Sequence, residues 1–159
     1  MLAHLPRPLL RVFQHAAHLW FRLARPLTMG VRAVALDAGG CVFLVRHSYL
    51  PGWHLPGGGV EVGETALEAL ARELREEGNL ALTGAPVLHG VYLNTFVTRR
   101  DHVLLYVARD VVQTHPRPAD REIVESGFFP VDRLPEGTAR ASLARLKEVL
   151  DGGPVSAFW

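Results

Sequence analysis

Cysteine is almost absent from this chain, since Cys41 is the only one among 159 residues. A single thiol excludes an intramolecular disulfide and leaves no cysteine-rich zinc site. Cys41 opens a run of strand-forming residues, where a small buried side chain is the expected role. Hydrophobic residues make up 48% of the chain and charged residues 21%. We therefore expect a globular protein of the reducing cytoplasm with one domain-sized core.

Acidic residues are missing from the N-terminal part of the chain, because none precedes Asp37. The bases before that position carry a charge of +5, and since the whole chain carries +1, the rest carries −4. These five bases are Arg7, Arg11, Arg22, Arg25 and Arg32. The charge pattern is that of a basic N-terminal segment joined to an acidic body.

Residues 6–25 have the spacing of a helix with one basic stripe. The stripe repeats every three or four residues and holds Arg7, Arg11, His15, His18, Arg22 and Arg25. Nearly all other positions are apolar, so this face must be covered. Packing on the body or in a homodimer is one alternative, and a helix lying on anionic membrane at the inner membrane face is another.

A targeting or spanning role for the same segment is disfavoured. There is no small-x-small cleavage site, and Arg11 and Arg22 interrupt the apolar run too early for a spanning helix. No nucleic acid partner is expected, because the remaining residues are apolar rather than polar or glycine-rich. We expect residues 1–28 to form this basic amphipathic helix, residues 29–152 the main domain and residues 153–159 a C-terminal tail.

The main domain alternates strand-like and helix-like stretches. Strands are expected at residues 31–36, 41–46, 87–96, 102–112 and 128–131. The first two flank Asp37-Ala38-Gly39-Gly40, which is a hairpin signal. A closing helix is expected at residues 139–150, with Leu143, Leu146 and Leu150 facing inward. Without internal repeats, this order predicts an α/β fold with a mixed sheet covered on both faces.

Residues 58–80 combine a glycine turn, a short helix and three closely spaced glutamates. The expected core stripe is Leu67, Leu70, Ala71 and Leu74, and the opposite face holds Glu64, Glu68, Arg72 and Arg75. On that face Glu68 and Arg72 have the spacing of an ion pair. Between the stripes lie Glu73, Glu76 and Glu77, below Ala66 and Ala69, which leave space over the carboxylates.

A solvated acidic face is the ordinary explanation of such a cluster, but it leaves repulsion unbalanced. Glu73 stands i,i+3 from Glu76 and i,i+4 from Glu77, each pair unfavourable by about 0.2 to 0.5 kcal/mol. The end of a helix also carries partial negative charge. A divalent cation would relieve this repulsion, and carboxylate oxygens are preferred ligands of Mg²⁺, with Mn²⁺ as a substitute.

The flanks of the helix have start and stop signals. Thr65 and Glu68 form a capping box, which predicts that the helix begins at Ala66. Asn79 can take the left-handed conformation that ends a helix. Upstream, residues 57–59 are all glycine and allow the backbone to approach a ligand.

These residues together resemble the signature of the Nudix hydrolase family, G-x5-E-x7-R-E-U-x-E-E-x-G-U, in which U is a bulky aliphatic residue. The matching positions are Gly58, Glu64, Arg72, Glu73, Leu74, Glu76, Glu77 and Leu80. The one departure is Asn79 in place of glycine, and since asparagine tolerates the left-handed region, the turn is expected to survive. Similarity extends to residues 53–58 and 127–135.

The resemblance implies the Nudix α/β/α sandwich, here preceded by an extra N-terminal helix. It also implies Mg²⁺-dependent hydrolysis of a phosphoanhydride bond in a nucleoside diphosphate linked to another moiety. By resemblance, Glu73 and Glu77 are the main metal ligands, Glu76 is an additional or water-mediated one, and the Gly57 carbonyl completes the set. Glu64 and Arg72 are expected to brace the loop against the helix.

The general base and the substrate contacts are less determined by the pattern. Glu122 is favoured as the base over Glu125, with a box glutamate as the alternative and ordinary loop acids as the simplest one. Candidate substrate contacts are Arg46, His47, Arg99, Arg100 and His102, each of which could equally be a solvated charge. Trp53 and Tyr92 are candidates for stacking on a base, although core packing is the favoured role of Trp53.

No marker outside the signature identifies the substrate. There is no SQPWPxPxS run, and Asn94 or Thr95 stands where a proline would resemble ADP-ribose hydrolases. The rival interpretation is a Nudix-fold module that binds a nucleotide without cleaving it. Such modules usually lose glutamates of the signature, and all of them are present here, so we expect a hydrolase.

Overall fold

The computed structural model describes residues 20, 26–96 and 98–159. The helix expected at residues 6–25, with its dimer, membrane and targeting alternatives, lies outside the described residues except for Trp20. Within the described ranges, no helix is both long and apolar enough to cross a membrane.

The strands form a mixed sheet arrangement, as predicted. Strand β1 (Thr28–Ala35) pairs in parallel with β5 (Asp101–Ala108), which pairs antiparallel with β4 (Val87–Leu93). Strand β2 (Val42–His47) pairs antiparallel with β7 (Ile123–Phe129). Two-residue strands, β3 (Leu80–Ala81) and β6 (Val112–Gln113), form a third pair.

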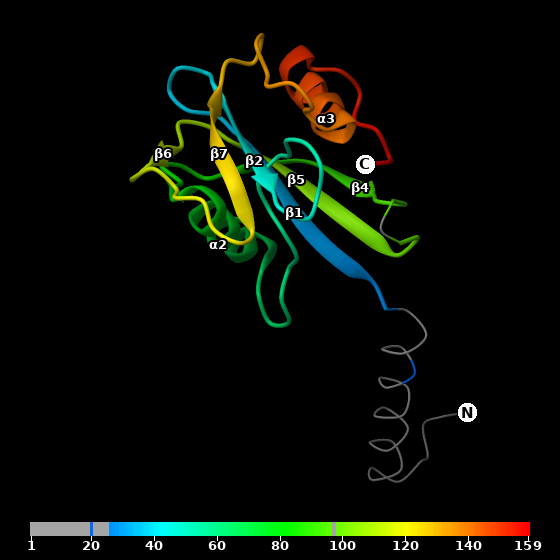
Figure 1. Cartoon of the computed structure of the whole chain (residues 1–159). Helices are drawn as coiled ribbons and strands as arrows, with labels where there is room; N and C mark the ends of the chain where they lie inside the picture. The colour runs from blue at the N-terminus through cyan, green and yellow to red at the C-terminus, as the bar shows by residue number, and fades with distance from the viewer. Residues whose placement is uncertain (1–19, 21–25, 97) are drawn as a thin grey trace, which may run out of the picture.

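Two helices, α2 (Ala66–Gly78) and α3 (Arg140–Asp151), lie on opposite sides of the strands in Figure 1. Successive side chains of β1 point to opposite faces, so the strand contributes to two cores. Val31 and Ala33 pack with Leu70 and Leu74 of α2. Val34 belongs to the second core, which contains Leu146 of α3. The α/β class and the layered arrangement are therefore confirmed.

The strands on either side of residues 37–40 were expected to form a hairpin, but they do not pair with each other in a ladder. The chain does reverse there, because the Asp37 N–H donates to the Cys41 carbonyl at 3.0 Å. However, only one isolated bridge, Leu36 with Val42, joins the two strands. The ladders of β1 and β2 are made instead with β5 and β7, whose side chains complete the two cores.

The last strand and the closing helix differ from their predicted form. Strand β7 begins at Ile123 and ends at Phe129, so the range 128–131 was wrong. In α3, Leu146 is buried, whereas Leu143 and Leu150 are 41% and 44% exposed. The buried face of α3 also carries Ser142 and Arg145. The helix therefore covers its core with a partly polar face.

Helix α2 begins at Ala66 with the predicted capping box and ends at Gly78, and its C-cap Asn79 has φ 52° and ψ 34°. Its buried stripe differs from the expected one, since Leu67 is 50% exposed and Ala69 is fully buried in the core. Ala69 therefore leaves no space over the carboxylates. The expected Glu68–Arg72 ion pair is also wrong, because the Glu68 carboxylate accepts from the Thr65 N–H at 2.8 Å.

The segment from Leu55 to Val60 lies along β1 and fixes the glycine turn in place. The Ala33 N–H donates to the Pro56 carbonyl at 2.9 Å, and the Val31 N–H donates to the Gly58 carbonyl at 2.8 Å. Gly57 has φ +138°, and a Cβ there would lie 2.1 Å from the Val31 carbonyl oxygen. This close approach requires glycine.

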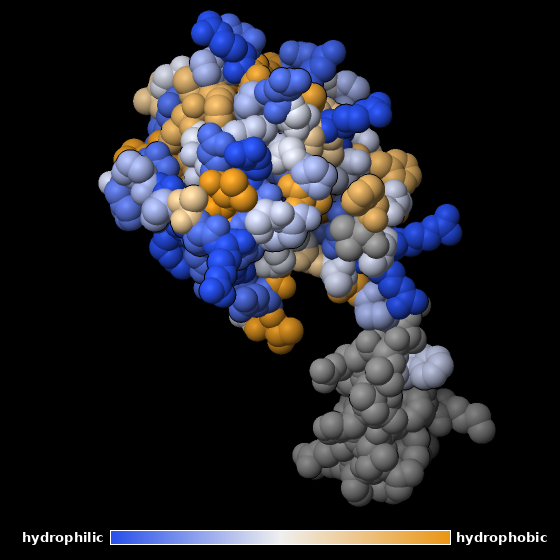
Figure 2. Space-filling model, in the orientation of Figure 1, coloured by the Kyte–Doolittle hydropathy of each residue, from blue (hydrophilic) through white to orange (hydrophobic). Residues whose placement is uncertain are grey.

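The C-terminal residues lie along β4 at the opposite side of the sheet from β1. The Leu93 N–H donates to the Ala157 carbonyl at 2.9 Å, and the Trp159 N–H donates to the Leu93 carbonyl at 3.1 Å. The ring of Trp159 packs edge-on against Tyr92, with centroids 5.6 Å apart. The surface of the molecule is mixed in Figure 2, with polar residues between separate apolar ones.

Candidate active site

Glu77, in the last turn of α2, is the most buried carboxylate of the signature. It is 6% exposed, and its Oε2 accepts a hydrogen bond from the Gly57 N–H at 2.7 Å. Burial raises the pKa of Glu77 to about 7, although the positive charge of Arg32 and the Gly57 hydrogen bond act in the opposite direction. A group with such a pKa exchanges its proton in the physiological range.

His47, at the end of β2, lies against this carboxylate. Its Nε2 is 3.4 Å from Glu77 Oε1, and the residue is 6% exposed. Burial lowers the pKa of His47 to about 4, and the positive charges of Arg32 and His54 lower it further. The ring is therefore neutral at physiological pH. It covers Glu77 without contributing a charge.

Glu73, one turn earlier on α2, reaches the same glycine turn. A Cβ on Gly58 would lie 2.3 Å from Glu73 Oε1, so the carboxylate occupies space that any other residue at position 58 would fill. The same oxygen accepts from Arg72 Nη1 at 2.7 Å. Glu73 and Glu77 therefore converge on adjacent residues of one turn, and the charge of Glu73 adds to the raised pKa of Glu77.

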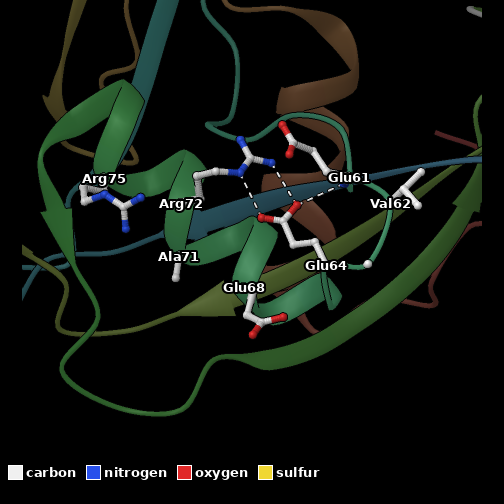
Figure 3. A pocket seen from close by; sticks show the side chains of 8 residues that line it. Glu61, Val62, Glu64, Glu68, Ala71, Arg72 and Arg75 are labelled. Carbon is white, nitrogen blue, oxygen red and sulfur yellow. Dashed lines mark hydrogen bonds and ion pairs between the residues drawn. The ribbon is translucent and has the colours of Figure 1, made fainter.

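Arg72 joins the loop before α2 to the helix. Its Nε donates to Glu64 Oε1 at 2.9 Å, and its Nη2 donates to the Gly59 carbonyl at 2.9 Å. Figure 3 shows Arg72 and Glu64 facing each other in front of the helix. A depression of about 570 Å³ lies beside this pair. Its lining residues are Glu61, Val62, Gly63, Glu64, Glu68, Ala71, Arg72 and Arg75. Neither Glu73 nor Glu77 lines this depression.

Glu76 lies at the rim of the site. Its side chain is 55% exposed, and its Oε2 is 3.4 Å from Arg72 Nη1. Glu76 is therefore much more exposed than Glu77. Among residues 20, 26–96 and 98–159, no group of three or more histidine, cysteine or acidic side chains is gathered for a metal ion.

The pair of Glu73 and Glu77 nevertheless fits a hard divalent ion. Mg²⁺ commonly takes one or two protein carboxylates and keeps the rest of its shell for water and phosphate. The two carboxylates meet at the Gly57–Gly58 turn, where a Cβ on Gly58 would displace Glu73 and the Gly57 N–H binds Glu77. A buried carboxylate beside a second one also gains from a neutralising cation.

Of the two loop acids, Glu122 is the one near the site. Its Oε1 accepts from the Tyr49 hydroxyl at 3.4 Å, and its charge adds to the raised pKa of Glu77. Glu125 instead pairs with Arg46 across β2 and β7, at 2.7 Å. Glu122 is therefore the acid of the two whose charge acts on Glu77, whereas Glu125 is engaged by Arg46.

The sequence-derived substrate candidates are scattered. Arg46 lies over the Trp53 ring, 5.6 Å from its centroid, and lines a second depression of about 400 Å³ with His47 and Tyr49. Trp53 is 7% exposed and Tyr92 is fully buried, with its hydroxyl donating to Glu148 Oε2 at 2.9 Å. Core packing accounts for both rings, so neither presents a face to a ligand.

The remaining candidates lie around the β4–β5 connection. Arg99 and Arg100 are exposed there, and His102 is half-buried in β5. Sequence reasoning overlooked three residues near Glu77, namely Arg32, Tyr49 and His54. Arg32 does leave a signal in the sequence, because it is a lone arginine in an otherwise apolar strand.

Comparison with known proteins gives one consistent result. The family model described as NUDIX domain matches residues 26–150. An ADP-ribose pyrophosphatase of Methanocaldococcus jannaschii is 39% identical over 83 residues, which are 52% of this chain and 48% of that protein. An RNA pyrophosphohydrolase of Dinoroseobacter shibae is 42% identical over 67 residues, 41% of this chain and 42% of that protein.

Solved structures share the fold. The crystal structure of a MutT NUDIX hydrolase from Burkholderia pseudomallei superposes with a TM-score of 0.65 and 26% identity, covering 77% of this chain and 97% of that one. The match to curated relatives is more local, since the chain spans about half the length of the first of them.

Proposed function

The chain belongs to the Nudix family, and from this premise we propose that it is a Mg²⁺-dependent hydrolase that cleaves a phosphoanhydride bond in a nucleoside diphosphate linked to another moiety. The observation that carries the proposal is the convergence of Glu73 and Glu77 on the Gly57–Gly58 turn. Two carboxylates held this way can bind a hard cation, which in turn binds the diphosphate.

The reaction needs control of charge, because a diphosphate repels a hydroxide nucleophile. When bound, the metal ion neutralises phosphate oxygens and lowers the pKa of the attacking water. Glu73 and Glu77 would hold the ion together with the Gly57 carbonyl, and Glu76 at the rim would contribute as an additional or water-mediated ligand. Arg72 fixes the turn by binding Glu64 and the Gly59 carbonyl.

Glu122 is the proposed general base. The water oxygen forms a bond to phosphorus while its proton passes to Glu122. The bond from phosphorus to the bridging oxygen breaks, and that oxygen leaves with the electron pair as part of the second phosphate. The relatives named above support this bond as the target, since both are named for pyrophosphate cleavage.

The test is chromatographic detection of the nucleotide products formed from a panel of nucleoside triphosphates, ADP-ribose, nucleotide sugars and dinucleoside polyphosphates in the presence of Mg²⁺. We expect turnover of at least one class, and its abolition in Glu73→Gln with the fold intact. Exposed Glu136, in the loop before α3, provides the control Glu136→Gln, which should leave turnover unchanged. Retained activity in Glu73→Gln would overturn the assignment.

The alternative function is a sensor that binds the nucleotide without cleaving it. The presence of all glutamates of the signature disfavours it. Silence across the whole panel, combined with nucleotide binding in calorimetry, would support this alternative.

A further inference from the structure

Arg32 is a charged residue in the middle of an apolar strand. Its neighbours Val31 and Ala33 in β1 are fully buried, and Arg32 itself is half-buried. Across the part of the chain that the structure describes, no carboxylate lies within ion-pair distance of its guanidinium. A cation in such a place normally has a partner, since burial of an unpaired charge is costly.

The guanidinium is held in position but keeps free donors. Arg32 Nη1 donates to the Leu55 carbonyl at 2.9 Å. None of its nitrogens is among the buried polar atoms that lack a partner, so the other N–H groups reach solvent. One hydrogen bond therefore orients the planar group, and the remaining donors are available to a ligand.

The backbone of Arg32 lies directly beneath the turn that holds the two carboxylates. A Cβ on Gly57 would lie 2.9 Å from Arg32 Cα, and the Gly57 N–H is the donor to Glu77. The Leu55 carbonyl that accepts from Arg32 Nη1 stands two residues before Gly57, so the guanidinium is anchored to the segment that leads into this turn. The site thus has a positive group beside its acidic one.

The chemistry of this pair points to a phosphate. One carboxylate oxygen of Glu77 already accepts the Gly57 N–H. Arg32 and Glu77 do not form an ion pair within 4.0 Å, because the ion-pair partner of Glu77 is His47. A planar guanidinium with free N–H groups matches two phosphate oxygens. We propose that Arg32 binds a phosphate group of the substrate beside Glu77 and is a specificity-determining residue for diphosphates, an inference that rests on the proposed function.

A purely structural role for Arg32 is the competing explanation. The side chain would then only hold the segment at Leu55 and offset the charge of Glu77. Such a role predicts lower stability after substitution but unchanged affinity for phosphate. Binding therefore separates the two explanations.

The experiment is calorimetric titration of inorganic pyrophosphate into the full chain without metal. The variants are Arg32→Met, which removes the charge, and Arg32→Lys, which keeps it without the planar fork. Exposed Arg109 supplies the control Arg109→Met. We expect wild type and the control to bind pyrophosphate, Arg32→Met to bind about ten- to a hundredfold more weakly, and Arg32→Lys to fall between them.

Two results would overturn the inference. One is no binding of pyrophosphate by wild type, and the other is equal affinity in wild type and Arg32→Met. If Arg32→Met does not fold, as judged by thermal unfolding, Arg32→Gln keeps a hydrogen-bond donor and takes its place with the same expected loss.

Hydrolysis measured with Mg²⁺ distinguishes this inference from the proposed function. We expect Arg32→Met to raise KM for the substrate more than it lowers kcat, because the lost contact is to bound phosphate. Pyrophosphate binding through Arg32 without any turnover of the panel would reject the hydrolase and keep the Arg32 site. Turnover with unchanged KM and unchanged pyrophosphate affinity in Arg32→Met would reject the Arg32 site alone.

Discussion

Glu77 is a buried carboxylate that is also a proposed metal ligand. The residue is 6% exposed, receives the Gly57 N–H and lies against the neutral ring of His47. Burial raises its pKa to about 7. In the protein without metal, this carboxyl group is therefore protonated below that pH, which keeps an uncompensated charge out of the interior.

Metal affinity should consequently depend on pH. The metal binds the carboxylate, whereas the proton occupies it below about pH 7, so protons and metal compete. We expect the affinity for Mn²⁺ to rise with pH through this value, with at most about a tenfold loss for each unit below it. Calorimetry between pH 6 and pH 8 measures this slope.

Glu77→Gln is the matched control for the pH experiment, because glutamine keeps the size and cannot titrate. We expect Glu77→Gln to bind Mn²⁺ more weakly than wild type, and we expect that affinity to change less with pH. A wild-type affinity that stays constant across the range would contradict the competition.

The space at Gly58 gives a second prediction for a single residue. In Gly58→Ala the new Cβ would lie 2.3 Å from Glu73 Oε1, so the carboxylate must move from the turn. We expect a large loss of kcat and of Mn²⁺ affinity. Gly59→Ala is the neighbouring control, since a Cβ there meets nothing within 4 Å. Equal activity in the two variants would show that the position of Glu73 is not critical.

Only some residues of the candidate site could be predicted from the sequence. The spacing of Glu73 and Glu77 could be predicted to matter, because both lie on the same side of one helix. The different exposure of Glu76 could not, since it depends on which loops cover the end of α2. His47 and Arg32 come from other strands, and only the fold brings them to Glu77.

Elements with local signals were predictable, and elements defined by distant partners were not. The capping box and Asn79 set the ends of α2 as expected. Strand β7 contains Ser126 and Gly127, which weaken the strand signal, and its extent follows from pairing with β2. The two-residue strands β3 and β6 are too short to have a sequence signal, and they form because they pair with each other.

The end of α2 allows a test of the cap. Asn79 has a positive φ of 52°, where an ordinary side chain costs about 1 to 2 kcal/mol. Asn79→Ala should lower the free energy of unfolding by about 1 kcal/mol, whereas Asn79→Gly should leave it nearly unchanged. Urea denaturation measures both. If alanine and glycine behaved alike, the left-handed cap would not be limiting.

On the scale of the whole molecule, the proposed metal-binding carboxylates and a polar cluster that stabilises the fold lie on opposite sides of the strands. The carboxylates belong to the α2 side. On the α3 side, Arg145 pairs with Glu148 at 2.5 Å, lies 4.5 Å from the Tyr92 ring centroid and donates to the Phe158 carbonyl at 2.7 Å. Arg145 is 5% exposed, so this cluster joins α3, β4 and the C-terminal residues inside the protein.

Removing Arg145 should therefore affect stability and leave catalysis intact. Arg145→Ala removes the close cation from Glu148, which keeps the Tyr92 hydroxyl and His89 at 4.0 Å, and breaking such a largely buried pair typically costs about 3 to 5 kcal/mol. We expect Tm to fall by roughly 6 to 15 °C, with kcat unchanged well below Tm. Exposed Lys147 provides the control Lys147→Ala, which should shift Tm little. A kcat loss at low temperature would indicate coupling between the two layers.

The pairing of Leu93 with Ala157 and Trp159 has a further consequence, for how the protein behaves in a crowded solution. An uncovered outer strand offers its backbone to any other chain that can add to it, and β4 carries the exposed side chains of Val87, Leu88 and Val91. The C-terminal residues occupy the backbone groups of this edge at Leu93. We expect proteolytic trimming behind α3 to free that edge for pairing with another chain.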